Sequence, residues 1–475
     1  MAPNSRYRRV AVIGSGPSGL SAVHALSQEK SFDSIRVFER RDRIGGRWLY
    51  DAVPDSFPES NPEAPNDRTI PTTTPSFTSP AAEDKTSRTG IYEGLDSNVG
   101  AGVMEFTHTP FPKVNSAGSV EKYGRNNPTR PYEVIAQYLE DLFTPYLHLV
   151  TLNTTIEKLE KDGEEWVVTL RQSRRKRQSG SVYDYWWTEK FDAVIVASGH
   201  YNVASIPSIP GLAEFQAKYP ERLGHSKAFR SANDYINKQV VVVGGNVSAS
   251  DLVIDLHQIV KGPLHLAQRG SNPALKNVWT LPNVKVRPEI VKLSIENNGT
   301  VHFSDGTNVS NIDKILFATG YRLSYPFIKP NPVTPSNRLA GFYQHIFQIS
   351  DPSLAVIGQV RAALSFRIYE YQAVAVARYF AGRTSLPSVE QQQDWEKKRL
   401  AYKGPSTLFH EIAPDFKDYF NLIRDLAGPP AEESDAYKLP AWQDSWPEEG
   451  FAVLALKDKL VQRLNPRPSE IKAKL

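Results

Sequence analysis

The chain has 475 residues, more than one ordinary domain holds, so two or three domains are expected. Apolar residues make up 40% and charged residues 23%, a composition typical of a globular protein with a large core, and a net charge of +4 is too small to indicate a nucleic-acid partner. There is no cysteine, which excludes disulfides, cysteine-ligated zinc, iron–sulfur clusters, a thiolate nucleophile and a redox-active dithiol.

No stretch of the sequence approaches the roughly 18 apolar residues that cross a bilayer. The first residues are basic and polar, without the apolar core of a signal peptide, and the last twenty are too charged for an anchor. We therefore expect a soluble, cytoplasmic protein with no membrane anchor.

The residues VAVIGSGPSGL at positions 10–20 predict a dinucleotide-binding turn. Three glycines follow an apolar run: the first allows a tight turn, the second lets backbone approach a pyrophosphate, and the third lets the helix pack on the strand. The phosphates would lie on N–H groups at the helix N-terminus. A second apolar run at 34–38 ends at Glu39, where a carboxylate would bind a ribose hydroxyl. The first dinucleotide site is thus predicted at Gly14, Ser15, Gly16, Pro17, Ser18, Gly19 and Glu39.

The next segments predict a mixture of loop, helix and strand. Residues 51–90 are rich in Pro, Ser and Thr and predict a long surface loop. A helix is expected at 130–142 and a β-hairpin at 154–170, and we interpret the basic run RQSRRKR at 171–177 as a solvated hairpin tip. A buried strand is expected at 191–197, and the Pro-rich residues 206–211 indicate a crossover into another domain.

The opening pattern recurs about 230 residues later. An apolar strand at 239–243 precedes GGNVSASD and a predicted helix that reaches about residue 260. Asn246 occupies the usual place of the middle glycine, and because asparagine tolerates left-handed backbone, we expect the turn to survive. The following strand, 264–267, ends at Gln268 and Arg269 instead of an acid. A carboxylate would repel a 2′-phosphate and Arg269 would pair with one, so FAD is expected at the first site and NADPH at the second.

Three further elements complete the prediction: strands at 314–317 and 354–357, and an amphipathic helix at 367–381 followed by charged helical segments. The fold class is α/β with two Rossmann-like domains. The FAD domain is expected to be discontinuous, at 1–206 and 321–475, and the NADPH domain to be inserted at 207–320.

Taken in order, further motifs resemble those of flavin-containing monooxygenases of the soluble type found in fungi and bacteria, over nearly the whole chain. Three departures are visible: the lengthened segment before His225 lacks the usual F-x-G, Ser97 replaces a threonine, and His108 replaces an aspartate. The matching segments are Gly45-Gly46-Arg47-Trp48, Tyr92 with Leu95 and Ser97-Asn98, Met104 to Pro112, Ser198-Gly199-His200, His225-Ser226 with Phe229, Phe317 to Tyr321, and Glu370-x-Gln372-Ala373.

The resemblance implies roles for single residues. Asn98 would be catalytic, donating its amide N–H to the oxygenated flavin or to a ribose hydroxyl of the nicotinamide nucleotide. Gln372 would approach the flavin, although a buried amide cap is an equal alternative. The further FAD contacts would be Gly46, Arg47, Trp48, Asn98 and Val99, and those to NADP would be Ser97, Asn98, Gly244, Ser248, Ala249, Ser250, Asp251 and Arg269. No metal is expected.

The activity implied by the resemblance is an NADPH- and O2-dependent monooxygenase. NADPH would reduce the flavin, O2 would add at flavin C4a to give a hydroperoxide, and an amine nitrogen or a thiol or thioether sulfur would take the distal oxygen. Two alternatives stay open: a Baeyer–Villiger enzyme acting on ketones, which the phenylalanine at 229 disfavours because those relatives usually carry tryptophan there, and a flavin reductase or nucleotide-binding protein without oxygenation. The expected partners are a small-molecule substrate and O2, and a homodimer is compatible with the sequence.

Overall fold

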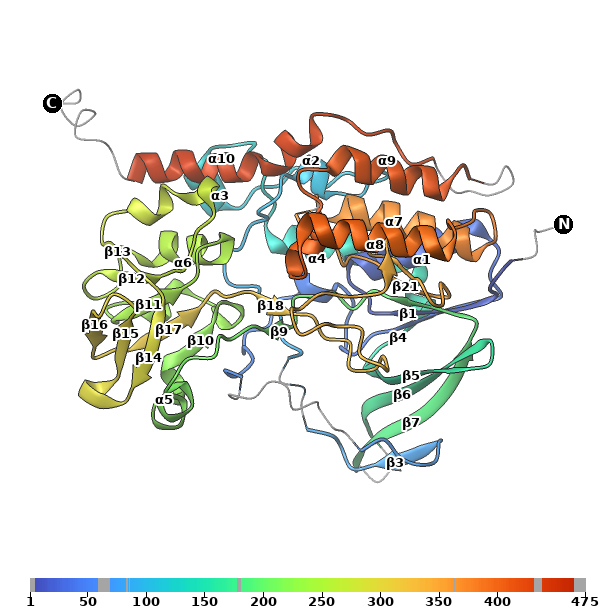
Figure 1. Ribbon diagram of the computed structural model, residues 1–475, viewed down its shortest axis with the longest axis horizontal. Coiled ribbons are helices and arrows are strands. Elements are labelled where there is room, and N and C mark those ends of the chain that lie inside the picture. The colour runs from blue at the N-terminus through green and yellow to red at the C-terminus, as the bar shows by residue number, and fades with distance from the viewer. Residues whose placement is uncertain are drawn as a thin grey trace.

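The computed structural model describes residues 5–58, 69–82, 84, 86–176, 181–362, 364–430 and 438–464. Two α/β units lie side by side, with helices above a central sheet and an antiparallel sheet below it in the right-hand unit of Figure 1. The predicted α/β class with two Rossmann-like units is confirmed.

The first unit is built on a seven-stranded sheet. Its central strands pair in parallel, and the apolar runs predicted at 10–13 and 34–38 lie in adjacent strands. Residues 10–13 of β1 (Arg9–Ile13) and all residues of β8 (Ala193–Val196) are apolar and buried, as expected for strands covered on both faces. The strand order is β19 (Phe342–Tyr343), β20 (Phe347–Gln348), β21 (Leu354–Val356), β8 (Ala193–Val196), β1 (Arg9–Ile13), β2 (Ser34–Phe38) and β4 (Val150–Thr151).

Helices cover one face of this sheet. α1 (Pro17–Glu29) begins at the first glycine-rich turn and packs along α7 (Phe366–Phe380), which is buried on almost every side. The remaining helices of this layer are α2 (Ala101–Met104), α4 (Tyr132–Phe143), α8 (Val389–Lys403) and α9 (Phe416–Ala427). The short helix α3 (Ala117–Tyr123) lies instead against the second unit, where Lys122 pairs with Asp255 (Figure 1).

An antiparallel sheet covers the opposite face, in the strand order β3 (Ser76–Thr78), β7 (Val182–Phe191), β6 (Glu165–Lys176) and β5 (Thr154–Asp162). The interpretation of the basic run as a hairpin tip is wrong for its first residues, because β6 continues through Lys176. Arg171 is buried and its guanidinium binds Glu157 Oε1 at 2.6 Å and Asp184 Oδ2 at 2.8 Å. Two carboxylates on neighbouring strands therefore neutralise this arginine inside the sheet. Arg177 lies outside the described residues.

The second unit carries a five-stranded parallel sheet and a three-stranded antiparallel sheet. α6 (Val247–Leu256) follows the second glycine-rich turn and ends four residues before the predicted end. The parallel sheet has the order β10 (Leu223–His225), β17 (Lys314–Phe317), β11 (Val240–Val243), β12 (Leu264–Ala267) and β13 (Val284–Arg287). The other elements are α5 (Leu212–Lys218), β14 (Ile290–Ser294), β15 (Thr300–Phe303) and β16 (Asn308–Ser310).

Two short strands join the units. β9 (Val203–Ala204) leads into the second unit, β18 (Tyr321–Arg322) returns from it, and the two pair antiparallel. The hydrogen bond from Ser205 N to Gly320 O extends this pair. The second unit is thus inserted into the first through two adjacent crossings.

The C-terminal helix α10 (Trp446–Leu464) runs along the top of the molecule past both units (Figure 1). Trp446 packs in the core of the first unit, whereas Val461 packs in the core of the second. A C-terminal segment expected to belong to the FAD domain alone therefore also contacts the inserted unit.

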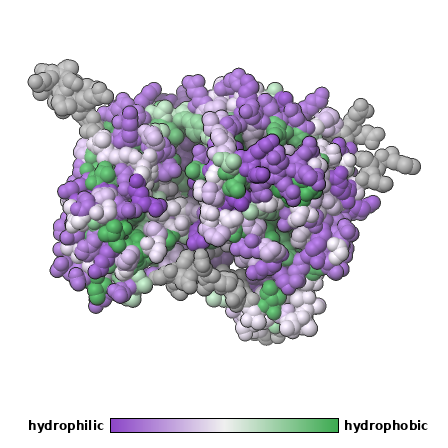
Figure 2. All heavy atoms as spheres, viewed as in Figure 1, coloured by the Kyte–Doolittle hydropathy of each residue, from purple (hydrophilic) through white to green (hydrophobic). Residues whose placement is uncertain are grey.

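The face shown in Figure 2 is mainly hydrophilic, with small scattered apolar areas. Among the helices of the described part of the chain, none combines the length and the apolar character that crossing a bilayer demands.

Candidate active site

The first glycine-rich turn connects β1 to α1 with no room for side chains. Gly14 has φ +102°, and a Cβ there would lie 2.8 Å from the carbonyl oxygen of Ala197 on the adjacent strand end. A Cβ on Gly19 would lie 2.0 Å from the carbonyl oxygen of Gly14, so only glycine lets α1 approach the turn. Gly14, Gly16, Pro17 and Ser18 line a large cleft, and the N-terminus of α1 opens into it. This is a cradle for a pyrophosphate.

Glu39 lies at the end of β2, as predicted, and is only 5% exposed. Its Oε2 accepts hydrogen bonds from Ser15 N at 2.9 Å and Ser15 Oγ at 2.7 Å, and its Oε1 accepts one from Arg41 N at 2.9 Å. A carboxylate has about four lone-pair sites, so capacity remains for a ribose hydroxyl at the cleft that Glu39 lines. Ser15 does not itself line the cleft, and the structure uses it to fix the carboxylate.

The segment after Glu39 closes over the same turn. Gly46 packs against Gly16, since a Cβ on Gly46 would lie 2.6 Å from the Cα of Gly16. Arg47 and Trp48 line the cleft, and the Arg47 guanidinium lies 4.4 Å from the ring centre of Tyr201 and 5.7 Å from that of Tyr321. These two tyrosines stand at the two crossings between the units, so a cation–π stack joins Arg47 to the junction. The motif predicted Arg47, but not its aromatic partners.

The second turn has the same course as the first with different side chains. Gly244 has φ +144°, and a Cβ there would lie 2.5 Å from the carbonyl oxygen of Ala318. The expectation of left-handed backbone at Asn246 is wrong: its φ is −128°, and Gly16, its counterpart in the first turn, is also extended at −79°. Asn246 instead caps α6, accepting a hydrogen bond from Val247 N at 2.9 Å. The turn tolerates asparagine because this position does not need positive φ.

Gln268 and Arg269 follow β12 where Glu39 follows β2. Both line the cleft, and Arg269 is exposed to it. The side-chain oxygen of Gln268 is buried and accepts no hydrogen bond within the described chain. A buried acceptor without a donor is costly, so this oxygen is suited to receive a ligand hydroxyl. From the sequence, Gln268 indicated only that no acidic residue stands at this position. Its unpaired amide oxygen makes Gln268 a further candidate for binding the nucleotide.

Five predicted NADP contacts around α6 divide into those that line the cleft and those that do not. Gly244 and Ser248 line the cleft beside Arg269. Ala249 and Ser250 are fully buried, and the Ser250 hydroxyl donates to Val247 O at 2.7 Å, so both serve the packing of α6. Asp251 also lines the cleft, but its carboxylate pairs with Lys457 of α10.

Asn98 is exposed on the cleft, in a loop whose other residues are fixed. Ser97 N donates to Arg130 O at 2.8 Å, and the Ser97 hydroxyl accepts from Arg130 N at 3.1 Å and donates to Val99 O at 3.0 Å. Ser97 does not line the cleft and therefore positions Asn98. Val99 lines the cleft beside it. The hydrogen bonds of Ser97 thus fix the backbone next to Asn98, whose side chain lies at the cleft.

Gln372 is fully buried in α7, away from the cleft lining. Its Oε1 accepts from Gly358 N at 2.9 Å, and its Nε2 donates to Tyr419 Oη at 2.9 Å. Gly358 lines the cleft against Ser18. Of the two interpretations of Gln372, the buried amide cap fits, because the side chain contacts Gly358 and Tyr419 and does not line the cleft.

The segment 225–230 fastens the long loop after Asp51 to the second unit. Lys227 Nζ binds Asp55 Oδ2 at 2.5 Å, and burial lowers the pKa of Lys227 while raising that of Asp55. The Arg230 guanidinium donates to the carbonyl oxygens of Asp51 and Thr89. The described part of the predicted surface loop is therefore tied down at both ends.

His200 lines the cleft at the junction and is 8% exposed. Neither ring nitrogen has a hydrogen-bond partner within the described residues. Burial, together with the nearby guanidinium groups of Arg361 and Arg47, lowers the pKa of His200 to about 3. The ring is thus neutral at physiological pH, and it can donate one hydrogen bond and accept another in the cleft.

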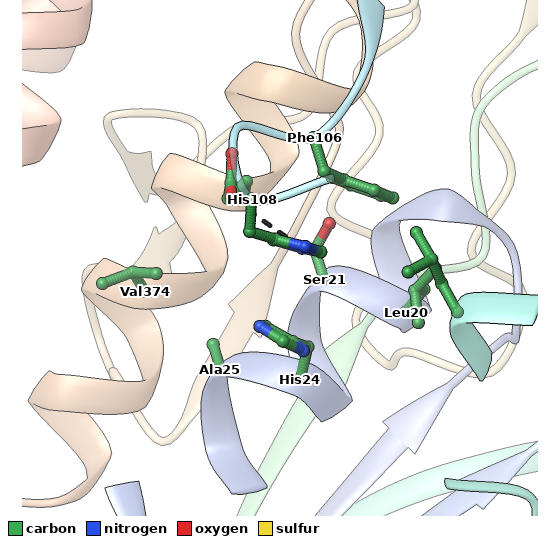
Figure 3. A pocket seen from close by; sticks show the side chains of 9 residues that line it. Leu20, Ser21, His24, Ala25, Phe106, His108 and Val374 are labelled. Carbon is green, nitrogen blue, oxygen red and sulfur yellow. Dashed lines mark ion pairs between the residues drawn. The ribbon is translucent and has the colours of Figure 1, made fainter. Parts of the chain in front are cut away.

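A second, separate pocket lies between α1 and α7 (Figure 3). The rings of His24 and His108 stack there with centres 4.4 Å apart, and His108 Nε2 lies 4.0 Å from Glu370 Oε1. Its volume of about 20 Å³ is enough for a single water molecule. His108 is therefore a packing partner of α1, and the pocket is too small for a cofactor.

The main cleft has a volume of about 2460 Å³, several times the roughly 300–1,000 Å³ of an ordinary ligand pocket. It reaches from Gly14 and Trp48 past Asn98 to Ser248 and Arg269, so both turns open into one space. At the first turn the glycines sit where any side chain would clash, and an acid follows the strand. This arrangement fits FAD. The second turn, with an orphaned amide oxygen and an exposed arginine at its strand end, fits NADPH.

Comparison with known families agrees with this arrangement. The family of flavin-binding monooxygenase-like proteins matches residues 271–429, the pyridine nucleotide-disulphide oxidoreductase family matches 105–344, and the NAD(P)-binding Rossmann-like domain matches 12–62. The second shares the paired-turn architecture, but its dithiol chemistry is excluded here because the chain has no cysteine.

Relatives match over almost the full chain. The flavin-containing monooxygenase ustF2 of Aspergillus flavus is 27% identical over 97% of this chain and 99% of its own length. The flavin-containing monooxygenase FMO GS-OX5 of Arabidopsis thaliana is 29% identical over 97% of both chains. The structure of S-allyl-L-cysteine S-oxygenase from Allium sativum has the same fold, with a TM-score of 0.71 and 24% identity over 98% of this chain and 99% of its own. The paired turns, the shared cleft and these matches show that the chain belongs to the flavin-containing monooxygenase family.

Proposed function

We propose that this enzyme uses NADPH and O2 to oxygenate a soft nucleophile, an amine nitrogen or a thiol or thioether sulfur. The observation that carries the proposal is the single cleft in which both dinucleotide turns meet beside the exposed side chain of Asn98. Relatives named as flavin-containing monooxygenases support a monooxygenase reaction, and the S-oxygenase of Allium sativum supports sulfur as one of the atoms that are oxygenated.

FAD and NADPH are the cofactors, and when bound they supply oxygen activation and reducing electrons respectively. The chain supplies position. The first turn and Glu39 hold the adenine dinucleotide of FAD, whereas Ser248, Gln268 and Arg269 hold NADPH, with the arginine on the 2′-phosphate.

Asn98 is the residue that we assign to the reacting end of the cleft. Its carboxamide donates N–H to the activated oxygen or to a ribose hydroxyl of the nicotinamide nucleotide, and the Ser97–Arg130 hydrogen bonds hold it there. Trp48 and the apolar side chains beside Asn98 exclude water from that end, which protects activated oxygen from release as hydrogen peroxide.

The test measures NADPH oxidation, hydrogen peroxide and a 16-dalton mass gain in a panel of amines, thiols, thioethers and ketones. We expect nitrogen or sulfur products from the wild-type enzyme. Asn98→Asp keeps the side-chain size but removes the N–H donor, so we expect product formation to fall by about 10²-fold while NADPH is still oxidised, with hydrogen peroxide as the product.

Asn331→Ala is the matched control, because Asn331 is also an exposed asparagine on the cleft, in another loop. It should leave product yield unchanged. Oxygen transfer to ketones alone, or NADPH oxidation with no oxygenated product from any class, would contradict the proposal.

The remaining expectations rest on the sequence. A net charge of +4 over 475 residues gives no basis for binding nucleic acid, so the partners that we propose are a small substrate and O2. A cytoplasmic location and a homodimer stay predictions, which cell fractionation and sedimentation would test.

A further inference from the structure

Helix α10 is anchored at both ends and lines part of the cleft between its anchors. Near its N-terminus, Trp446 packs against Phe420 at a ring-centre distance of 5.5 Å, and the Arg367 guanidinium lies over its ring at 4.4 Å. Near its C-terminus, Val461 is buried in the second core, and Lys457 pairs with Asp251 of α6. The helix therefore has a fixed position over both units.

The helix also touches the loop that carries Asn98. Gly100 N donates to Gly450 O at 3.0 Å, and a Cβ on Gly100 would lie 2.1 Å from the carbonyl oxygen of Glu449. On the other side, a Cβ on Gly450 would lie 2.5 Å from Leu364 Cδ2. Gly100 and Gly450 thus allow the backbone of α10 to contact the backbone of the loop, two residues after Asn98.

The residues of α10 that follow this contact line the cleft. Gly450, Phe451 and Leu454 all face the cleft, and the two larger side chains lie one helical turn apart. Phe451 is 37% exposed, and its ring centre lies 5.9 Å from that of Phe416, which holds it on one side. Together with Val99 and Leu364, which also line the cleft, they make an apolar wall next to Asn98.

We propose that Phe451 and Leu454 form the substrate-facing wall of the chamber beside Asn98 and set the length of the apolar substituent that the substrate carries. This inference rests on the proposed function, because it names the residues that set the size of the substrate at that same site. The wall presents no charge or hydrogen-bond donor, so it binds the substituent by burial of apolar surface alone.

The test compares kcat/KM over a series of alkyl methyl sulfides of increasing chain length in the purified holoenzyme. Phe451→Ala and Leu454→Ala open the chamber, so the chain length with the highest kcat/KM should become longer. Leu454→Phe fills the chamber and should move that optimum to shorter chains. For the longest relative to the shortest substrate, we expect kcat/KM to change by about tenfold in opposite directions for the two kinds of variant.

Leu456→Ala is the matched control, because Leu456 is a half-buried leucine of the same helix that does not line the cleft. It should leave the optimum unchanged. FAD content, NADPH KM and substrate-free NADPH oxidation report whether a variant damages the cofactor sites, and Phe451→Leu replaces Phe451→Ala if the alanine variant does not fold.

The outcomes separate the two proposals. A wild-type enzyme that oxygenates no sulfide or amine refutes the proposed function, and the wall with it. An active wild-type enzyme whose chain-length optimum is the same in all wall variants, or moves as much in Leu456→Ala, refutes the wall and leaves the proposed function standing.

Discussion

Glu39 offers a sharp test of the first dinucleotide site, because its carboxylate both shapes the turn and faces the cleft. It accepts three hydrogen bonds from Ser15 and Arg41, two of them on Oε2 and one on Oε1. In Glu39→Gln only one oxygen remains. If that oxygen keeps the two bonds from Ser15, the new NH2 group must face the backbone N–H of Arg41. Two hydrogen-bond donors then face each other, and the bond from Arg41 is lost.

The magnitude follows from these contacts. Hydrogen bonds to a charged partner contribute about 1.5–3 kcal/mol and neutral ones about 0.5–1.5 kcal/mol, so the variant loses one strong bond and weakens two. The neutral amide is cheaper to bury than a carboxylate, which offsets part of the loss. We expect the apoprotein to lose about 2–3 kcal/mol of unfolding free energy. Loss of a charged acceptor for the ribose hydroxyl should raise the FAD Kd by about 10–100-fold.

Urea unfolding of the apoprotein and flavin-fluorescence titration measure these two quantities separately. Glu121→Gln, at an exposed position of α3, is the matched control and should change neither. Ser15→Ala removes the shortest of the three bonds, and the double variant should cost less than the sum of the singles because both act on one interaction. An FAD Kd within twofold of the wild-type value, together with an unchanged free energy of unfolding in Glu39→Gln, would refute this account of the turn.

Three further variants test other contacts. Gly19→Ala places a methyl group 2.0 Å from the carbonyl oxygen of Gly14, so the purified protein should lack flavin absorbance; a yellow protein would contradict the close approach. Lys457→Met leaves the carboxylate of Asp251 without its ammonium partner, which should cost about 1–3 kcal/mol in urea unfolding and raise the NADPH KM, with partial recovery in the double variant with Asp251→Asn. For His200, a folded pKa of about 3 lies below the ordinary 6.5, so the unfolded chain alone takes up a proton as pH falls below 6.5. His200 therefore costs no stability above pH 6.5 and about 2 kcal/mol at pH 5, and His200→Gln should flatten the pH dependence of stability between these values; parallel curves would show that the histidine is not buried neutral.

Local sequence predicted the features whose causes are local. The strand at 34–38 has the predicted bounds because its apolar residues, Ile35, Val37 and Phe38, end at a buried acid. The spacing of Gly14 and Gly19 is set by one turn and its own helix, so it could be read from eleven residues. Cleft-lining positions after strand ends, such as Arg269, follow from the same rule for parallel sheets.

Features that depend on distant partners were not predictable from these motifs. Ser97 points away from the cleft because its hydroxyl binds the backbone of Arg130. Gln372 accepts a hydrogen bond from the backbone of Gly358, which lies before α7 in the chain. Arg171 was assigned to solvent because its two carboxylate partners stand on neighbouring strands, which the basic run itself does not reveal. A pattern of residue types fixes which groups are present, but the direction of each side chain depends on what the fold brings next to it.

The position of α10 shows how this dependence connects the two nucleotide sites. The contact between Gly100 and Gly450 joins residues 350 positions apart, and it places the helix against the loop of Asn98. Seven residues further along, Lys457 contacts Asp251 in the helix that follows the second turn. A displacement of α6 on nucleotide binding would therefore be transmitted along a helix whose backbone contacts the loop of Asn98, and not only through the cleft. Because an α-helix resists bending over two turns, the reacting end of the cleft and the NADPH turn cannot change their separation independently while both contacts hold.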